Sequence, residues 1–307
     1  MRLHSLLLTH QQLGSLHVNS DRMRQMTVVS GKGGTGKTTV LGSFAALSEN
    51  KVLADCDVDA ANLHLLLHPD IEVRSDFYGA KIAVRDEEKC VRCGMCELRC
   101  RFDAITSEEV DELACEGCGL CTLVCPAHAL TLETIKSGEY YLSATKYGPM
   151  AHAKLMPGGE SSGRLVTVVR QQAEDLALRD GRYLILIDGP PGIGCTATAS
   201  LTDVDLALVV TEPTLSGMHD MERVVQLIEH FGHRCAVIIN KVDLNPENSA
   251  SIREFALEHG VPVVGEIPFD ETVTHAIAAG RPLVEFSNGP AASAVREAWV
   301  GTAGLLT

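Results

Sequence analysis

The amino-acid sequence predicts an α/β fold, with a mostly parallel sheet covered by helices on both faces and a small α+β insert. Short apolar strand segments alternate with helical segments along most of the 307 residues, which is typical of parallel strands joined by crossover helices. Hydrophobic residues make up 45% of the chain and aromatic residues 4%. Cysteines are concentrated in one central segment. The predicted parts are a disordered tail (1–24), a discontinuous main domain (25–79 and 137–307) and the insert (80–136).

A glycine-rich loop follows the first predicted strand, residues 25–30, and a helix continues from Thr39. The loop matches the phosphate-binding pattern G-x-x-x-x-G-K-S/T in the strand–loop–helix context that this pattern requires. Its backbone N–H groups close around phosphate oxygens at a helix N-terminus. We expect Lys37 to reach the terminal phosphates and the Thr38 hydroxyl to hold Mg²⁺. The predicted nucleotide-binding residues of the loop are Gly31, Gly33, Gly34, Thr35, Gly36, Lys37, Thr38 and Thr39.

The loop carries a second lysine, Lys32, and its pattern K-G-G-x-G-K-S/T resembles that of the MinD/ParA/Mrp group of P-loop ATPases. The resemblance extends over nearly all of residues 26–306. It implies a P-loop NTPase fold, ATP or ADP with Mg²⁺ as ligands, and slow, partner-stimulated ATP hydrolysis. In that family the first lysine of the loop reaches the partner's phosphates across a nucleotide-sandwich dimer. The resemblance therefore implies this role for Lys32. The resemblance also implies a homodimer, or a heterodimer with a paralogue, that forms on ATP binding.

Acidic residues follow two further strands, at positions that the resemblance places around Mg²⁺. The strand at residues 51–54 leads to Asp55 and Asp57. The family places Asp55 near the metal and Asp57 at the switch that positions the attacking water. Asp188 follows a second apolar strand and matches the Walker B carboxylate that binds Mg²⁺, and residues 189–192 match the second switch. The carboxyl ends of parallel strands lie at one edge of the sheet, so these groups are expected to meet.

Asn240 and Pro268 are the predicted contacts to the base. Asn240 begins the string Asn-Lys-Val-Asp after the strand at residues 236–239. This string mimics a guanine-reading motif, whereas in the MinD-like family the asparagine reads adenine, and we follow the family. The prediction that the protein binds ATP rather than GTP therefore depends on the resemblance alone. Pro268 follows the strand at residues 263–267 and resembles the segment that flanks the base.

The clustered cysteines form two copies of C-x2-C-x2-C-x3-C, the spacing of bacterial two-cluster ferredoxins. Each run supplies three ligands of one cluster, and its last cysteine ligates the other cluster. Zinc and disulfides are the alternatives, but zinc sites pair two C-x2-4-C units over a longer gap, and disulfides are rare in a reducing compartment. One 4Fe–4S cluster is assigned to Cys90, Cys93, Cys96 and Cys125, and the other to Cys115, Cys118, Cys121 and Cys100.

The two cysteine runs are an internal repeat with an offset of 25 residues at every cysteine. Residues 104–106 also map onto residues 129–131 at this offset. One departure is Arg101, because the second copy has Pro126 at that position, as the ferredoxin spacing usually does. The whole chain looks like the subgroup of MinD-superfamily ATPases that carries an inserted ferredoxin domain.

The formal net charge of −14 gives no electrostatic basis for binding nucleic acid or an anionic membrane. No apolar run approaches the roughly 20 residues of a membrane helix, so no stable membrane insertion is expected. A cytoplasmic, reducing compartment suits free thiolates on clusters. Residues 291–307 are predicted to form a helix that docks onto the sheet, because Ala292, Val295 and Trp299 share a face and Arg296 is its only basic residue.

The leading functional hypothesis is an ATP-driven dimer switch coupled to electron transfer through the two clusters. The resemblance leaves two alternatives, a cluster scaffold or carrier of the Mrp type and a MinD-like spatial regulator with redox-sensing clusters. Fold alone does not decide among them. The expected partner is a redox or metallocofactor protein of unknown identity.

Cys195 lies seven residues after Asp188, just past the second switch. In the nitrogenase iron protein, which belongs to the same superfamily, a cysteine at a similar distance ligates a cluster shared between subunits. That arrangement needs a second cysteine, and the sequence offers no counterpart. The preferred interpretation is therefore a small residue that packs beneath the switch.

Overall fold

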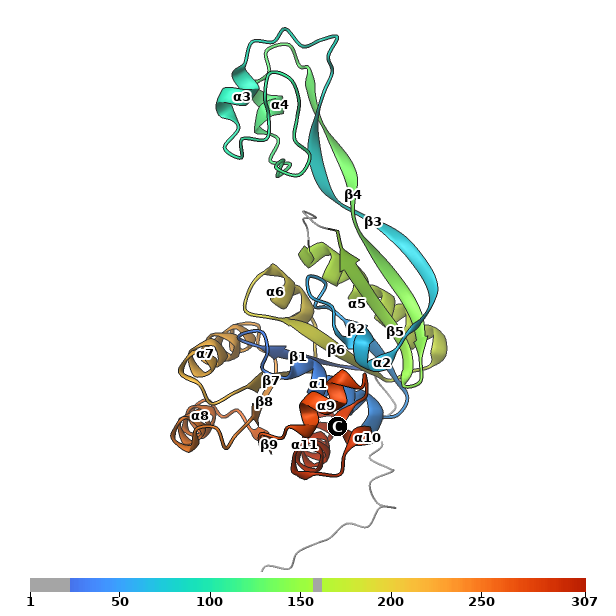
Figure 1. Cartoon of the computed structure of the whole chain (residues 1–307), viewed down its shortest axis with the longest axis vertical. Coiled ribbons are helices and arrows are strands. Elements are labelled where there is room, and N and C mark those ends of the chain that lie inside the picture. The colour runs from blue at the N-terminus through green and yellow to red at the C-terminus, as the bar shows by residue number, and fades with distance from the viewer. Residues whose placement is uncertain (1–22, 157–161) are drawn as a thin grey trace, which may run out of the picture.

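The computed structural model describes residues 23–156 and 162–307, and its body is a nine-stranded sheet between two layers of helices (Figure 1). The strand order is β3-β4-β5-β2-β6-β1-β7-β8-β9. All neighbouring pairs from β5 to β9 in this order are parallel, and only β3–β4 and β4–β5 are antiparallel. The predicted α/β class with a mostly parallel sheet is thus confirmed. The strands are β1 (Arg24–Ser30), β2 (Lys51–Asp55), β3 (Asp70–Arg85), β4 (Leu130–Thr145), β5 (Gly148–Leu155), β6 (Leu184–Pro191), β7 (Leu206–Thr211), β8 (Cys235–Asn240) and β9 (Val263–Ile267).

Two apolar cores lie on opposite faces of the sheet, because successive strand residues point to opposite sides. In β1, Val29 belongs to the core under α5, α6, α7 and α8, whereas Val28 belongs to the core under α1, α2, α9, α10 and α11. Helices therefore cover both faces, as predicted. The helices are α1 (Lys37–Leu47), α2 (Leu63–Leu67), α3 (Met95–Arg99), α4 (Leu120–Val124), α5 (Ser162–Asp180), α6 (Cys195–Leu201), α7 (Leu215–His230), α8 (Pro246–Glu258), α9 (Thr272–Ala278), α10 (Leu283–Phe286) and α11 (Pro290–Leu306).

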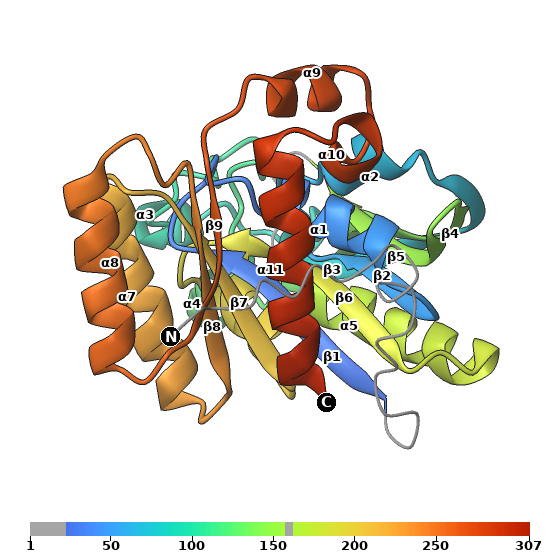
Figure 2. The ribbon, with the colours of Figure 1, turned by 90° about the horizontal axis from the view of Figure 1, so that it is seen from below.

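The C-terminal helix α11 packs along β9 and beside α1 (Figure 2). Val295 and Ala292 are fully or almost fully buried, and the Trp299 ring lies 5.0 Å from the Phe44 ring between centroids. The predicted docking of this helix onto the body is confirmed. Across residues 23–156 and 162–307, the structure contains no helix with the length and apolarity to cross a membrane.

A two-stranded stalk carries the cysteine segment away from the body (Figure 1). Only Gly138–Thr145 of β4 pairs with β5, so residues 78–85 of β3 and 130–137 of β4 continue beyond the sheet as an antiparallel pair. At about 3.3 Å per residue, this stalk is roughly 25 Å long. Residues 86–129 form the tip at its end. The tip contains α3, α4 and irregular loops.

The predicted domain limits fall near the base of the stalk. Residues 80 and 136 lie almost opposite each other in the β3–β4 pair, where the register shifts. The Ser137 hydroxyl accepts hydrogen bonds there from the backbone N–H groups of Gly79 and Ala80. The predicted tail lies outside the described residues except for Met23 and Arg24, and Arg24 already belongs to β1.

Acid is expected to destabilise the body through His152, a β5 residue that is only 8% exposed. Its Nε2 lies 2.8 Å from the Ser143 hydroxyl, and its ring stacks on Tyr141. Burial, with a contribution from His64, lowers the pKa of His152 from 6.5 to about 4. Between these two values the unfolded chain binds a proton that the folded chain does not, so the free energy of unfolding should fall as the pH drops from 6.5 to 4, by at most about 3 kcal/mol.

The measurement is denaturant unfolding at several pH values for the native chain and for His152→Gln. The glutamine keeps a polar side chain beside Ser143 but does not titrate. The native chain should lose more stability than the variant between pH 6.5 and 4. Parallel pH profiles would contradict the assignment of this acid sensitivity to His152.

Candidate functional site

The phosphate loop connects the end of β1 at Ser30 to the start of α1 at Lys37. Gly34 and Gly36 have φ values of 80° and 97°, a left-handed region that glycine enters without steric cost. A Cβ atom on Gly36 would also lie 2.4 Å from the Asn240 side-chain nitrogen. The loop therefore requires glycine at this position both for its conformation and for space. Lys37 begins the helix and is only 6% exposed.

Asp55 and Asp188 lie side by side at the sheet edge, because β2 and β6 pair in a register that sets these residues opposite each other. Both side chains are buried. The Thr38 hydroxyl donates a hydrogen bond of 2.8 Å to Asp188 Oδ2. Asp188 Oδ1 is buried and has no hydrogen-bond partner among the described residues. An acceptor atom of this kind is costly unless a ligand or a cation satisfies it.

The three predicted carboxylates are electrostatically crowded. Burial and the charge of Asp188 raise the pKa of Asp55 well above its usual value. Burial also raises the pKa of Asp188 to about 6, although Lys37 and the hydrogen bond from Thr38 oppose the shift. Burial raises the pKa of Asp57, and Lys37 again opposes it. A divalent cation would remove this penalty, and the available carboxylate and hydroxyl oxygens are ligands that suit Mg²⁺.

A cleft of about 510 Å³ opens beside the loop, in the size range of small-ligand sites. Three glycines and Lys37 of the predicted loop line it, together with Asp57 and the two threonines that follow Lys37 in α1. Sequence reasoning missed the apolar wall, which Leu65, Leu66 and Ile277 supply from α2 and α9. No local motif marks these residues. The predicted residues that line the cleft are Gly33, Gly34, Gly36, Lys37, Thr38, Thr39 and Asp57.

Of the two predicted base contacts Asn240 touches the loop, and neither lines this cleft. The Asn240 side-chain amide donates a hydrogen bond of 2.8 Å to the Thr35 carbonyl oxygen, so the end of β8 touches the loop. Pro268 is half-buried after β9. The next residue, Phe269, donates its backbone N–H to the Asp243 carboxylate at 2.7 Å. Loop, β8 and β9 thus meet at one edge of the sheet.

Lys32 points toward the start of α7 rather than into the cleft of its own chain. Its Nζ lies 2.7 Å from Glu212 Oε1 and 3.1 Å from both the Thr214 and the Ser216 hydroxyl oxygens. The other Glu212 oxygen pairs with Lys241 at 3.0 Å. Burial alone would raise the pKa of Glu212. The hydrogen bonds from the two lysines outweigh burial, and the pKa lies below its usual value. The Lys32–Glu212 pair was not predicted from the sequence.

The internal repeat is visible in the backbone of the tip. Helices α3 and α4 begin and end at positions that differ by the same 25-residue offset as the cysteines. Gly94 and Gly119, which precede them, have φ values of 73° and 76°. The last cysteine of each run, Cys100 or Cys125, follows its helix in an extended conformation. The two copies therefore share one local structure.

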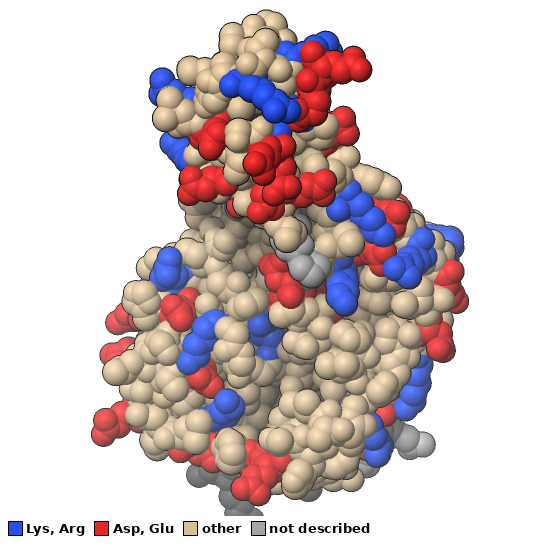
Figure 3. Space-filling view, turned by 45° about the horizontal axis from the view of Figure 1, so that its top comes forward, with Lys and Arg blue, Asp and Glu red and all other residues tan. Residues whose placement is uncertain are grey.

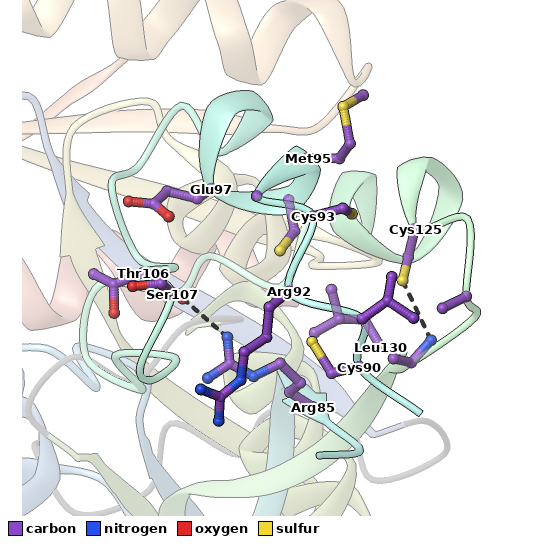
Figure 4. Close-up of a pocket in the computed structure, with 15 residues that line it drawn as sticks. Arg85, Cys90, Arg92, Cys93, Met95, Glu97, Thr106, Ser107, Cys125 and Leu130 are labelled. Carbon is purple, nitrogen blue, oxygen red and sulfur yellow. Dashed lines mark hydrogen bonds between the residues drawn. The ribbon is translucent and has the colours of Figure 1, made fainter. Parts of the chain in front are cut away.

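Two pockets in the tip are each lined by four cysteines, and in both the fourth comes from the other copy; Figure 4 shows the first pocket. The first pocket contains Cys125 and the first three cysteines of the first run. The second contains Cys100 and the first three cysteines of the second run. These are the two ligand sets that the sequence predicts. The sets are Cys90, Cys93, Cys96 and Cys125, and Cys115, Cys118, Cys121 and Cys100.

The donor chemistry of the tip fits a pair of thiolate-bound clusters. All eight cysteines are free thiols. Across residues 23–156 and 162–307, no three His, Cys, Asp or Glu side chains converge closely enough to hold a single ion. A four-iron cluster is wider than one ion and holds its thiolates farther apart, so the two pockets are compatible with it. The buried hydrophobic cluster where the tip meets the stalk consists of Ala83, Ile105, Cys121 and Leu130, which is little for a unit of this size.

Cys195 is exposed at the first position of α6. The interpretation of this residue as packing beneath the switch is therefore wrong. Its Cβ faces Gly163 at the start of α5, where an added Cβ atom would lie 3.4 Å away. The starts of α5 and α6, which are far apart in the sequence, are therefore in contact at Gly163 and Cys195.

The fold and the loop define the class of this protein as a P-loop nucleotide-binding protein. Residues 26–283 match the family model of the CobQ/CobB/MinD/ParA nucleotide binding domain, and the chain belongs to this family. The family predicted from the loop is thus confirmed.

Curated relatives agree with this membership, and solved structures share the fold. An uncharacterized protein of Methanocaldococcus jannaschii is 34% identical and covers 80% of this chain and 86% of its own length. The septum site-determining protein MinD of Synechocystis is 25% identical over 85% of this chain and 82% of its own. The structure of MinD with Mg-ADP from Pyrococcus horikoshii has a TM-score of 0.56 at 20% identity, over 90% of this chain and 94% of its own. The Pyrococcus furiosus cell division ATPase MinD has a TM-score of 0.57 at 21% identity, over 92% and 99%.

Proposed function

We propose that this chain is an ATP-binding and ATP-hydrolysing iron–sulfur protein, in which an ATP-driven dimer switch is coupled to electron transfer through two 4Fe–4S clusters. The observation that carries the iron–sulfur part is the pair of four-cysteine pockets, each completed by a cysteine from the other repeat. Such clusters supply one-electron redox chemistry when they are bound. The chain contributes the thiolates and a stalk that holds them away from the body.

The nucleotide half of the proposal is supported by the loop and by the acidic edge of the sheet. Lys37, almost fully buried at the start of α1, provides the positive charge for the terminal phosphates. Thr38, Asp55 and Asp188 provide oxygen ligands for Mg²⁺, and the unpartnered Asp188 oxygen supports this role. Asp57 lines the cleft and is the residue proposed to position the attacking water. The Mg-ADP complex of the Pyrococcus horikoshii MinD supports this nucleotide chemistry by similarity.

A dimer is proposed because Lys32 lies outside the cleft of its own chain, held by Glu212. Once its ion pair with Glu212 opens, Lys32 is free to contact the phosphates bound to a second subunit. The redox partner is proposed to carry complementary positive charge, since Asp and Glu outnumber Lys and Arg in the tip. Figure 3 shows acidic side chains gathered on the visible face of the tip. Complementary charge mainly raises the rate of association.

Anaerobic reconstitution with iron and sulfide is expected to give about eight irons per chain, since each proposed cluster holds four. Cys93→Ser and Cys118→Ser should each lower the iron content toward about four, because each removes a ligand of a different cluster. Iron and sulfide analysis, with electron paramagnetic resonance (EPR) of the reduced protein, measures both effects.

Cys235→Ser is the matched control, because this cysteine lies in β8 of the body and lines neither pocket. It should keep the full iron content. Tightly bound zinc with no iron after anaerobic reconstitution would defeat the proposal. Loss of all iron in Cys93→Ser alone would contradict the division into two separately ligated clusters.

A MinD-like spatial regulator is the second candidate function, and the matches to MinD proteins over most of the chain favour it. The two candidates differ in what the clusters do. Reversible reduction that depends on nucleotide state supports the electron carrier. ATP-dependent localisation of a fluorescent fusion, unchanged in a chain without clusters, supports the regulator. Transfer of iron to an apo-protein would instead identify a carrier of the Mrp type.

A further inference from the structure

The two cysteine pockets differ in charge, although the repeat gives them the same backbone. Arg92 in the first copy corresponds to Gly117 in the second, and both are left-handed, with φ values of 52° and 58°. In the second copy a Cβ atom would lie 2.3 Å from the Lys81 carbonyl oxygen, so glycine is required. The first copy carries an arginine in a conformation that costs a side chain free energy.

Arg92 and Arg85 together form a cationic wall on the first pocket (Figure 4). The Arg85 side chain is only 6% exposed. It donates hydrogen bonds to the Glu87 carboxylate and to the backbone carbonyl oxygens of Thr106 and Glu108. Glu87 also lies 4.0 Å from Arg92, so one carboxylate is shared by two guanidinium groups. This group of three side chains retains one net positive charge.

The positive charge lies close to the thiols of the first pocket. Arg85 and Arg92 line the same pocket as Cys90. Glu97 is the other charged residue of the lining, and Figure 4 shows its carboxylate directed away from Cys90. Any negative charge on this set of thiolates is therefore opposed by a nearby, partly buried cation.

The second pocket has no cation in its lining. Its only charged residue other than the cysteines is Glu116, and its walls include Ala83, Ile105 and Leu132. Hydrogen bonds to sulfur do not distinguish the pockets, because each receives one from a backbone N–H, at 3.3 Å to Cys125 and 3.4 Å to Cys115.

A reduced cluster carries one more negative charge than an oxidised one, so nearby net charge sets its reduction potential. We infer that Arg85 and Arg92 make the cluster of Cys90, Cys93, Cys96 and Cys125 the more easily reduced of the two. This inference rests on the proposed function. The first electron that the protein accepts then resides on this cluster. Its pocket includes Arg85 and Leu130 at the outer ends of β3 and β4, whereas Ala83 and Leu132 of the second pocket lie two residues nearer the body.

The test is a potentiometric titration of the full chain, reconstituted anaerobically and followed by EPR. Arg92→Gly restores the glycine of the other repeat, so it removes the charge and relieves the backbone. It should lower the ratio of electron occupancy between the first and second clusters about tenfold, which corresponds to about 59 mV for one electron. Arg92→Lys keeps the charge and should change the ratio less than about threefold.

Two single-cluster backgrounds assign the potentials. In Cys118→Ser only the first cluster remains, and adding Arg92→Gly should lower its potential. In Cys93→Ser only the second remains, and Arg92→Gly should leave its potential unchanged. Arg179→Ala is the control for a general charge effect, because Arg179 is an exposed residue of α5 in the body and lines neither pocket. It should leave the occupancy ratio unchanged.

The outcomes separate this inference from the proposed function. A native chain that binds no iron would overturn the proposed function and the inference with it. A chain that binds eight irons, but whose more easily reduced cluster is the one lost in Cys118→Ser, would overturn the inference alone. Equal shifts of both potentials in Arg92→Gly, or no shift of either, would also overturn only the inference.

Discussion

Replacing Lys32 with alanine is expected to slow ATP hydrolysis about a thousandfold, the effect of losing a cation supplied in trans to a transferring phosphoryl group. Nucleotide affinity of the single chain should stay within about threefold of the native value, because Lys32 does not line the cleft of its own chain. ATP-dependent dimerisation should also be lost. Turnover under saturating ATP, affinity for a fluorescent nucleotide, and mass by light scattering with and without ATP measure the three effects.

Lys241→Met is the matched control for this experiment. Lys241 pairs with the same Glu212 carboxylate that holds Lys32, at 3.0 Å against 2.7 Å. If the loss of turnover in Lys32→Ala arose only from an unpaired Glu212, the control would lose turnover to a similar degree. Native turnover in Lys32→Ala would show that the lysine has no role across a dimer interface.

Lys37→Ala is expected to weaken nucleotide binding about a hundredfold, because charged hydrogen bonds to phosphate of roughly 1.5–3 kcal/mol are lost. A second cost adds to this loss. Lys37 holds down the pKa values of Asp57 and Asp188, so its removal leaves the buried Asp188 and the half-buried Asp57 with less compensation. These groups then bind protons more readily and Mg²⁺ less well near neutral pH. Isothermal titration calorimetry with Mg-ADP measures the affinity.

Lys51→Met is the control for the burial of a lysine. Lys51 is as deeply buried as Lys37, and burial lowers its pKa to about 8. It begins β2, whereas Asp55 ends that strand at the nucleotide edge. Its replacement should leave the affinity for Mg-ADP unchanged. Binding by Lys37→Ala within about threefold of the native chain would remove Lys37 from the phosphate site.

The phosphate loop and the cysteine repeat were readable from the sequence because their chemistry depends on local spacing. A loop that wraps phosphates needs glycines and a lysine at fixed intervals, and the strand and helix on either side provide its context. Three thiolates for one cluster must come from one short turn, which limits their spacing to a recognisable pattern. The backbone of the tip reflects this, since α3 and α4 repeat at the offset of the cysteines.

The meeting of acidic residues at the carboxyl edge of the sheet was predicted from the order of the strands and helices, not from a local motif. Alternation of strands and helices predicted that Asp55 and Asp188 would meet, and the pairing of β2 with β6 sets them opposite each other. The rule that parallel strands end at the same edge of a sheet was sufficient for this prediction. It gave no information about the shared wall of the cleft, where Ile277 of α9 approaches from the other end of the chain.

By itself, therefore, the sequence determined the class of fold and the loop that defines the family, and it predicted the two sets of cysteines, because each depends on residue types at short, fixed separations. Tertiary structure alone decided that Glu212 holds Lys32, that Cys195 lies at the surface and that Arg85 stands beside Cys90. The first two depend on contacts between segments that are distant in the chain, and the third depends on the path of the chain after β3 ends at Arg85. Their geometry follows from how whole elements pack, which no local pattern of residues records.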